Sequence, residues 1–497
     1  MKPTEATNLE KVWMMPTPQN WLPPLELFIG GRWQPGTDGQ LMPVVDPSTT
    51  QVIAEVADAD VVDGVRAVDA AEKAMRDWRG CPPRRRAEIL HRCFELMVER
   101  SDQLALLICD ENGKALSDAR GEIAYAAEFF RWYAEEAVRN NGELNESPAA
   151  GHRILVRYEP IGVALLVTPW NFPAAMATRK IAPALAAGCG VVLKPAPTTP
   201  LTALAIAELM AEAGVPDGLV NVVPTSRSAE VVDALLHDPR VRKLSFTGST
   251  AVGRILLREA SDQVISCSME LGGNAPVIIF DDADLDDAVE ATILAKMRNG
   301  GQACTAANRI YVQDGIRDAF VQRLSQRMSA LVVGPPRDPG TQCGPVADEA
   351  SLMKIQDMVA DALEHGASLV TGGGRPSDAG YFYTPTVLDG VTAEARIAKE
   401  EVFGPIAAVF PFSEEAEAIE RANDTEVGLA AYVLTGDLAR GLRISEQLEV
   451  GMVGINRGLV SEPAAPFGGV KASGLGREGS HHGMREFCEA KYVAVSW

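Results

Sequence analysis

Two side chains in this sequence have the chemistry for covalent catalysis, a cysteine and a glutamate. Cys304 closes the segment GQAC, between a glycine-rich loop and a strand-like apolar run. A thiol there could be exposed and act as a nucleophile, although a single cysteine is more often a small core residue. Glu270 ends another strand-like run, in MELGGN. Burial would raise the pKa of its carboxyl group and suit it to general-base catalysis, whereas the alternative is a surface glutamate in a turn.

Four further segments place polar groups at predicted turns. In TPWNFP, Asn171 follows the apolar run 161–168. Strand ends in parallel sheets face ligand crevices, so its amide could donate to a developing oxyanion, although a proline-rich turn is the alternative. FTGSTAVG (246–253) combines a strand end, a Gly-Ser turn and a helix start, where free backbone amides bind phosphate. The segments EEVFGP (400–405) and PFGGVK (466–471) are only turns when each is taken alone.

Two successive sets of alternating strands and helices must position these groups. The first set has predicted strands at 161–168, 191–193, 219–223, 241–246 and 263–269, and helices at 174–187, 201–213, 229–236 and 251–260. The second has strands at 276–280, 309–312, 406–409, 430–434 and 452–455, and helices at 285–297, 316–331, 352–364 and 414–422. Strands without polar alternation indicate parallel sheets covered by helices on both faces. The sequence therefore predicts an α/β fold of two lobes with a ligand cleft between them, and Asp284 as a helix N-cap.

The composition excludes several classes of partner. The 497 residues are 46% hydrophobic and 23% charged, as in soluble globular proteins, and the length predicts two or three domains at about 150 residues each. The net charge of −21 argues against nucleic acid and anionic membranes. Neither a signal peptide nor a transmembrane run is apparent. Eight cysteines without a CxxC pair suggest a reducing compartment, so we expect a cytoplasmic protein.

Metal binding is not expected from the sequence, and two segments are expected to be exposed strands. The six histidines show no zinc-type spacing, and the adjacent His481 and His482 are expected in a solvated turn. Residues 141–158 and 489–497 are polar or alternate polar with apolar residues. Such exposed strands need pairing, and a neighbouring subunit is the simplest partner.

Taken together and in order, the six segments resemble the aldehyde dehydrogenase superfamily, from about Leu27 to the C-terminus. The glutamate of MELGGN and the cysteine of GQAC are the most specific parts of the resemblance. The fold that it implies has a Rossmann-type parallel-sheet cofactor domain, an α/β catalytic domain and a small β oligomerisation arm. The expected boundaries are 1–25 for an N-terminal arm, 26–140 and 159–271 for the dinucleotide-binding domain, 272–455 for the catalytic domain, and 141–158 and 480–497 for the oligomerisation strands.

The resemblance also implies a reaction. Cys304 attacks the aldehyde carbon, and the Asn171 side-chain amide and the Cys304 backbone amide stabilise the oxyanion. Hydride leaves for the nicotinamide and a thioester remains, for which the site must favour the thiolate. Glu270 then activates the water that releases the acid.

Eight positions are expected to bind the cofactor: Trp170, Lys194, Pro197, Gly248, Ser249, Leu271, Glu401 and Phe403. Many members of the superfamily have glutamate where Pro197 stands, and there it binds the ribose hydroxyls of NAD. Proline cannot bind these hydroxyls, nor does it repel a 2′-phosphate, and Lys194 can attract that phosphate. NADP is therefore favoured and NAD remains possible. Arg227 could assist or be an ordinary surface charge.

Within the superfamily the sequence most resembles succinate-semialdehyde dehydrogenase, in WNFPAAMATRK, KLSFTGST and APFGGVKASGLGREGS among other segments. The positions of Arg179, Arg298 and Ser461 match those that hold the substrate carboxylate in that family, and charge-assisted bonds of this kind contribute about 1.5–3 kcal/mol each. The alternative is that each arginine forms an ion pair with the scaffold. The segment Cys304-Thr305-Ala306 lacks the second cysteine of some members, so their redox switch is expected to be absent.

Three rival functions remain open at this stage. The enzyme could oxidise glutarate semialdehyde or a neutral aldehyde, it could be a thioester-forming hydrolase or acyltransferase, or it could be a non-redox scaffold. The resemblance implies a homodimer or homotetramer, acting on a small aldehyde with a distal carboxylate.

Overall fold

The computed structural model describes residues 21–496, so most of the expected N-terminal arm (1–25) lies outside the described residues. The first sheet has five parallel strands at its centre, in the order β9 (Val220–Val222), β8 (Val191–Lys194), β7 (Val163–Val167), β10 (Val241–Thr247) and β11 (Ser266–Glu270). One edge is extended by β1 (Leu27–Ile29) and β2 (Arg32–Gln34), the other by β21 (Gly474–Leu475). The predicted parallel sheet is confirmed, and every residue of β7, β8 and β9 is buried.

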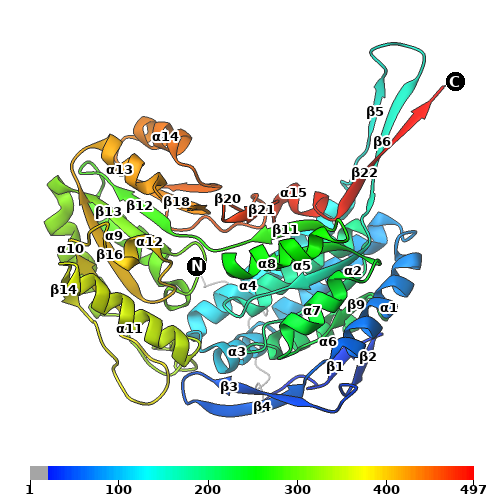
Figure 1. Cartoon of the computed structure of the whole chain (residues 1–497), viewed down its shortest axis with the longest axis horizontal. Helices are drawn as coiled ribbons and strands as arrows, with labels where there is room; N and C mark the ends of the chain where they lie inside the picture. The colour runs from blue at the N-terminus through cyan, green and yellow to red at the C-terminus, as the bar shows by residue number, and fades with distance from the viewer. Residues whose placement is uncertain (1–20, 497) are drawn as a thin grey trace, which may run out of the picture.

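The first sheet separates two hydrophobic cores. Ala164 and Leu166 of β7 face one core, whereas Val163, Leu165 and Val167 face the other, because successive strand residues point to opposite faces. The helices of the first core are α2 (Pro83–Glu99), α3 (Ser101–Asn112), α4 (Leu116–Ala137), α5 (Pro173–Ala187) and α6 (Leu201–Glu212). Those of the second are α1 (Val61–Trp78), α7 (Ser228–Leu236) and α8 (Thr250–Ser261). Helices thus cover both faces (Figure 1).

Four of these helices, α1 to α4, were not assigned from the sequence, nor was the antiparallel hairpin of β3 (Leu41–Asp46) and β4 (Gln51–Ala57). A signal for α4 was present, since Ile123, Ala126, Phe130 and Ala134 are all buried and recur at helical spacing. α4 packs against α2 and α5. This helical layer supports the back of the loop that carries Asn171.

A second sheet forms the other lobe. Its order is β14 (Ser368–Thr371), β15 (Thr386–Asp389), β16 (Ile406–Phe412), β13 (Ala307–Gln313), β12 (Ala275–Ile279), β18 (Ala430–Leu434) and β19 (Met452–Ile455). All neighbours are parallel except β14. Its helices include α9 (Leu285–Met297), α10 (Asp314–Ser329), α11 (Glu349–Glu364), α13 (Glu415–Asn423) and α14 (Leu438–Gln447). Asp284 caps α9 by accepting from the amides of Asp286 and Asp287, both at 3.0 Å, as predicted. Between residues 21 and 496, no helix has the length and apolar character to cross a bilayer.

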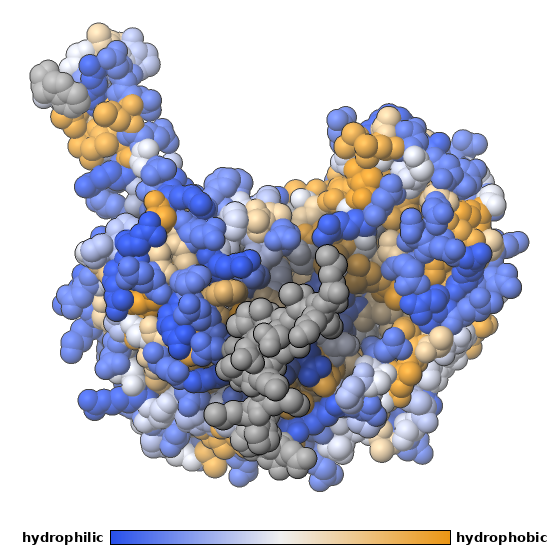
Figure 2. Space-filling model, turned by 180° about the vertical axis from the view of Figure 1, so that it is seen from behind, coloured by the Kyte–Doolittle hydropathy of each residue, from blue (hydrophilic) through white to orange (hydrophobic). Residues whose placement is uncertain are grey.

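The polar segments near 141–158 and at the C-terminus form a separate three-stranded sheet. β6 (Arg153–Pro160) pairs with both β5 (Glu143–Glu146) and β22 (Cys488–Val495), and the sheet projects from the first lobe (Figures 1 and 2). The expected pairing partner was a neighbouring subunit, but these strands pair with each other inside the chain. The expected strand region from 480 also begins with a helix, α15 (Ser480–Arg485). The outer edges of β5 and β22 have no strand partner among the described residues.

A buried ion pair ties α4 to the start of α5. The side chains of Lys114 and Glu122 form an ion pair and are both fully buried. The second Glu122 oxygen accepts from the amides of Ala174 and Ala175, at 2.8 and 3.2 Å. It therefore satisfies two free donors in the first turn of α5. Because Asn171 lies just before this turn, the ion pair fixes the loop as well as the helix.

Removing one partner of this ion pair should destabilise the protein. We expect Lys114→Met to lower stability by about 3–5 kcal/mol, because it leaves the Glu122 carboxylate buried without its cation. The midpoint of urea unfolding should fall accordingly. The matched control is Lys491→Met, which breaks the exposed pair between Lys491 and Glu159 on the three-stranded sheet. This change should cost at most about 1 kcal/mol of stability. Equal midpoints for the two variants would contradict this account.

Candidate active site

A cavity of about 380 Å³ lies between the two lobes, where the carboxyl ends of β7, β10 and β11 meet the second lobe. Such crevices are the usual ligand sites of parallel sheets. The sequence-predicted residues that line it are Trp170, Asn171, Gly248, Ser249, Glu270, Leu271, Cys304, Glu401 and Phe403. The structure thus brings all three predicted catalytic residues together with six of the eight predicted cofactor residues.

The loop before Cys304 has an unusual backbone. Asn299, in the turn η1 (Arg298–Gly301), has φ of 51°, and Gly301 has φ of 80°. A Cβ atom on Gly301 would lie 2.1 Å from the carbonyl oxygen of Gly404. Only glycine therefore allows this loop to pass so close to the turn of EEVFGP. The close approach fixes where Cys304 enters the cavity.

Burial disfavours the thiolate form of Cys304 in the free protein. Burial raises its pKa to about 12, although the charges of Arg179 and Arg298 act in the opposite direction. The expectation from the sequence was a site that favours the thiolate. The structure differs because desolvation outweighs the two arginines, neither of which forms an ion pair with the sulfur.

Residues from both lobes hold Asn171. Its side-chain Nδ2 donates to the carbonyl oxygen of Gln302 at 3.1 Å. Its own main-chain oxygen accepts from Lys114 Nζ at 2.8 Å and from Asn299 Nδ2 at 2.9 Å. One amide hydrogen is therefore committed to Gln302, and the other remains to donate to an oxyanion on the carbon that Cys304 attacks.

Glu270 is the last residue of β11 and is only 2% exposed. Burial raises the pKa of its carboxyl group well above the usual range, and the charge of Glu478 adds to this rise. Oε2 of Glu270 has no hydrogen-bond partner among residues 21–496. A Cβ atom on Gly468 would lie 2.8 Å from Glu270 Oε1, so glycine leaves the space that this carboxyl group occupies. The arrangement suits a base that accepts a proton from water.

A charged cluster lies behind Glu270. Glu478 forms ion pairs with both Arg179 and Lys180, and all three side chains are buried. Lys180 Nζ also donates to Ser245 Oγ at 3.0 Å. The positive charges of Arg179 and Lys180 oppose the rise in the pKa of Glu270. The cluster therefore moderates the effect of burial on the base.

The cavity has the donors and acceptors that a dinucleotide requires. Ser249 caps α8 through a 3.3 Å bond from the Val252 amide, and the remaining free amides of this turn can bind phosphate. A Cβ atom on Gly248 would lie 2.5 Å from the ring of Phe246, so the turn requires glycine. Burial raises the pKa of Glu401 to about 7, and its carboxyl group can accept from ribose hydroxyls.

Two predicted cofactor residues lie outside this cavity. Lys194 is 5% exposed and donates to Ser228 Oγ at 2.9 Å, and burial lowers its pKa to about 8. Pro197 lines a separate cavity of about 300 Å³, shared with Trp170 and Thr199. Arg227 donates to Asp38 at 2.7 Å, so its charge is already paired.

The predicted substrate residues occupy two different environments. Arg298 and Ser461 line a second cavity of about 250 Å³, next to Phe172. The guanidinium of Arg298 lies 5.1 Å from the Phe172 ring centre and has no ion-pair partner in the described part of the chain. Arg179 does not line this cavity, because it is 1% exposed, pairs with Glu478 and lies 4.4 Å from the ring centre of Phe467.

Sequence reasoning missed several residues of the first cavity. Thr247, Gly272 and Val402 lie within the predicted segments and Met176 lies close to one, so proximity in the sequence could have found them. Ser351 and Lys354 come from α11, which carries no motif. Lys354 Nζ donates to the main-chain oxygen of Glu401 at 2.7 Å. It therefore holds the turn that presents Glu401 and Phe403.

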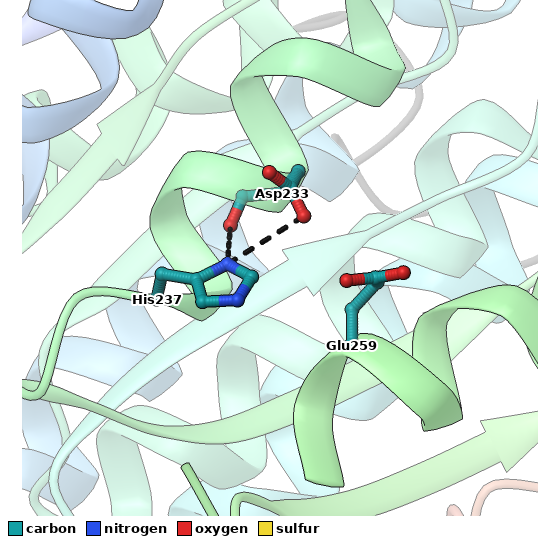
Figure 3. A group of neighbouring side chains, drawn as sticks. All are labelled: Asp233, His237 and Glu259. Carbon is teal, nitrogen blue, oxygen red and sulfur yellow. Dashed lines mark hydrogen bonds and ion pairs between the residues drawn. The ribbon is translucent and has the colours of Figure 1, made fainter. Parts of the chain in front are cut away.

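A surface cluster of Asp233, His237 and Glu259 has ligand atoms within 4.8 Å of one another. Figure 3 shows His237 bonded to Asp233 on one side, with Glu259 on the neighbouring helix. The main-chain oxygen of Asp233 raises the pKa of His237, and nearby carboxylates add to this rise. Ion pairing of a protonated histidine accounts for the cluster. It lies at the C-terminal ends of α7 and α8, whereas the first cavity contacts the N-terminal end of α8.

Comparison with known proteins agrees with this geometry. The pattern of the Aldehyde dehydrogenase family matches residues 33–493. The chain is 48% identical to glutarate-semialdehyde dehydrogenase of Pseudomonas aeruginosa and 49% identical to succinate-semialdehyde dehydrogenase (NADP+) of Escherichia coli, in both cases over 95% of this chain and 97% of the relative. The crystal structure of succinate-semialdehyde dehydrogenase from Burkholderia pseudomallei superimposes with a TM-score of 0.94 at 49% identity, covering 95% of this chain and 98% of that one. The chain belongs to the aldehyde dehydrogenase family.

Proposed function

We propose that the protein oxidises succinate semialdehyde to succinate, with NADP as the favoured cofactor and NAD as the alternative. The observation that carries the substrate assignment is Arg298, a guanidinium without an ion-pair partner among the described residues, beside Ser461 in the second cavity. A distal carboxylate supplies the missing anion. Glutarate semialdehyde is the second candidate, because a relative that acts on it is as similar as one that acts on succinate semialdehyde.

The proposed chemistry uses three residues of the first cavity. The Cys304 thiol gives its proton to solvent and its sulfur bonds to the aldehyde carbon, while the Asn171 amide donates to the resulting oxyanion. A bound oxidised nicotinamide supplies the acceptor for the hydride that leaves this carbon, and its positive charge favours the thiolate. A thioester to Cys304 remains. Glu270 takes a proton from water, the hydroxide adds to the thioester carbon, and the carbon–sulfur bond breaks to release the acid and the thiol.

The proposed substrate selection depends on charge. Arg298 and Ser461 bind the distal carboxylate directly, since both line the second cavity. Arg179 contributes only its positive charge and no direct contact with the substrate, because its side chain is buried and paired with Glu478. A neutral aldehyde would leave Arg298 without an anion and would therefore bind less well.

The preference for NADP rests on Lys194. Its buried ammonium group bonds to Ser228, and no described carboxylate forms an ion pair with it. The side chain of Pro197 offers no acceptor for ribose hydroxyls. The 2′-phosphate of NADP would provide the anion that this lysine lacks.

Replacing Arg298 tests the substrate assignment. We expect Arg298→Ala to lower kcat/KM for succinate semialdehyde by about 10- to 150-fold, through loss of one charge-assisted interaction. The value of kcat/KM for butanal, which has no carboxylate, should fall much less. Steady-state rates from the absorbance of the reduced nicotinamide give both numbers, and Cys304→Ala sets the background. Equal losses for the two aldehydes would rule out a carboxylate site at Arg298, and the same assay with glutarate semialdehyde compares the two candidates.

The pH dependence follows from the two buried reactive groups. Burial raises the pKa of both Cys304 and Glu270, and each must be deprotonated to act. The rate should therefore increase with pH between about pH 6 and pH 9. Glu270→Gln should retain one rapid turnover of hydride and then hydrolyse the thioester about 10²- to 10⁴-fold more slowly. Stopped-flow absorbance measures both phases, and a variant without this burst would contradict the role given to Glu270.

The cofactor preference can be tested at Lys194. Lys194→Met should raise KM for NADP by about 10-fold or more, since one charge-assisted interaction with the 2′-phosphate is lost. KM for NAD should change much less. The control is Arg227→Met, which removes a cation already paired with Asp38 and should leave the ratio of the two KM values near that of the wild type. An unchanged ratio in Lys194→Met would contradict the preference for NADP.

A further inference from the structure

Tyr125 is a residue of the second cavity to which neither the sequence motifs nor the proposed reaction assigns a role. It lies on α4, and its side chain lines the cavity together with Arg298 and Ser461. An edge-to-face contact with Phe129, at 4.9 Å between ring centres, holds its ring in place. The ring therefore forms a rigid part of the cavity wall.

The hydroxyl group of Tyr125 is buried, and its hydrogen has no acceptor within residues 21–496, although its oxygen interacts with the guanidinium of Arg179. A buried hydroxyl hydrogen without an acceptor costs free energy, and buried tyrosines usually find one. On helix α5, Nη2 of Arg179 is also buried without a hydrogen-bond partner. Unsatisfied donors next to a cavity indicate a ligand that satisfies them.

The surroundings of this hydroxyl group indicate the charge of that ligand. Burial raises the pKa of Tyr125, whereas the charges of Arg179 and Arg298 and a side-chain interaction with Arg179 lower it, and the charge of Glu478 adds to the rise. The hydroxyl group therefore lies in the field of both arginines. Arg179 is paired with Glu478, and Glu122, which also lines the cavity, is paired with Lys114. Arg298 forms no ion pair among the described residues, although the Asp118 carboxylate lines the same cavity and lies in its field. The cavity thus offers an unpaired guanidinium and an unused neutral donor, and both favour an anion that can accept hydrogen bonds.

We propose that the Tyr125 hydroxyl group is a specificity-determining ligand, which donates a hydrogen bond to the distal carboxylate of the substrate beside Arg298 and Ser461. This inference rests on the proposed function, because it assumes a carboxylated aldehyde. The carboxylate has two oxygens with room for several donors. Tyr125 thus helps to orient the substrate carboxylate without adding a charge to the site.

The same helix provides a matched control. Tyr133 is fully buried, and its hydroxyl hydrogen also has no acceptor among the described residues. It lies close to Gly483 rather than at the second cavity. Replacing either tyrosine by phenylalanine removes one hydroxyl group from a buried site on α4. The two variants therefore make the same chemical change on α4, but only Tyr125→Phe makes it at the second cavity.

The test compares Tyr125→Phe with Tyr133→Phe in the full-length enzyme. We expect Tyr125→Phe to lower kcat/KM for succinate semialdehyde by about 10- to 100-fold, mainly through KM, because a hydrogen bond to a charged group is lost. The value of kcat/KM for butanal should fall far less, so the ratio of kcat/KM for succinate semialdehyde to that for butanal should decrease. Tyr133→Phe should leave this ratio at the wild-type value. The thermal unfolding midpoint of Tyr125→Phe should stay close to that of the wild type, since the hydroxyl hydrogen has no acceptor among the described residues and only the interaction of its oxygen with Arg179 is removed.

The outcomes separate this inference from the proposed function. If Arg298→Ala lowers the ratio and Tyr125→Phe does not, the role of Tyr125 is wrong while the carboxylate site stands. If neither variant lowers it, both proposals are wrong. If Tyr125→Phe and Tyr133→Phe lower the ratio equally, the effect comes from the packing of α4 and the direct hydrogen bond is overturned.

Discussion

The main-chain oxygen of Asn171 is the point on which the reactive centre depends. It accepts from Lys114, which belongs to the helical layer of the first lobe, and from Asn299, which belongs to the loop of the nucleophile in the second. A carbonyl oxygen has two lone pairs, and here each lobe uses one. The oxyanion donor and the nucleophile are thereby fixed relative to each other across the boundary between lobes. A displacement of either lobe would separate the two groups that must act on one carbon atom.

Burial then determines how this centre behaves. The same dry environment that would strengthen an oxyanion hydrogen bond also raises the pKa of Cys304 and of Glu270 in the free protein. The cluster of Arg179, Lys180 and Glu478 carries a net positive charge and lies close enough to oppose that effect. Burial therefore favours the neutral forms of both reactive groups, and a bound ligand that changes the local charge would alter this balance. Such a resting state also makes the thiol less prone to oxidation, because the thiolate is the reactive species.

Sequence patterns predicted the two parallel sheets because their strands are uninterrupted apolar runs, a pattern that does not depend on distant residues. Asn171, Gly248 and Glu270 were found for a related reason, since they lie at or just after strand ends, whereas Cys304, Glu401 and Phe403 were assigned through the resemblance to the family. Three features could not be predicted in this way. The pairing of Arg179 with Glu478, the pairing of β6 with β22, and the contribution of Lys354 each join segments far apart in the chain. Helices α1 to α4 were overlooked although α4 carries a clear apolar stripe.

The three-stranded arm has a consequence for evolution. Its outer strands β5 and β22 expose main-chain amides and carbonyls along their free edges, and every residue of β5 is solvent-exposed. Backbone groups are the same in nearly every amino acid, so a strand that docks onto such an edge recognises spacing and direction instead of side-chain identity. The surface side chains of the three-stranded sheet can therefore change without altering the hydrogen-bonding pattern that its edges offer.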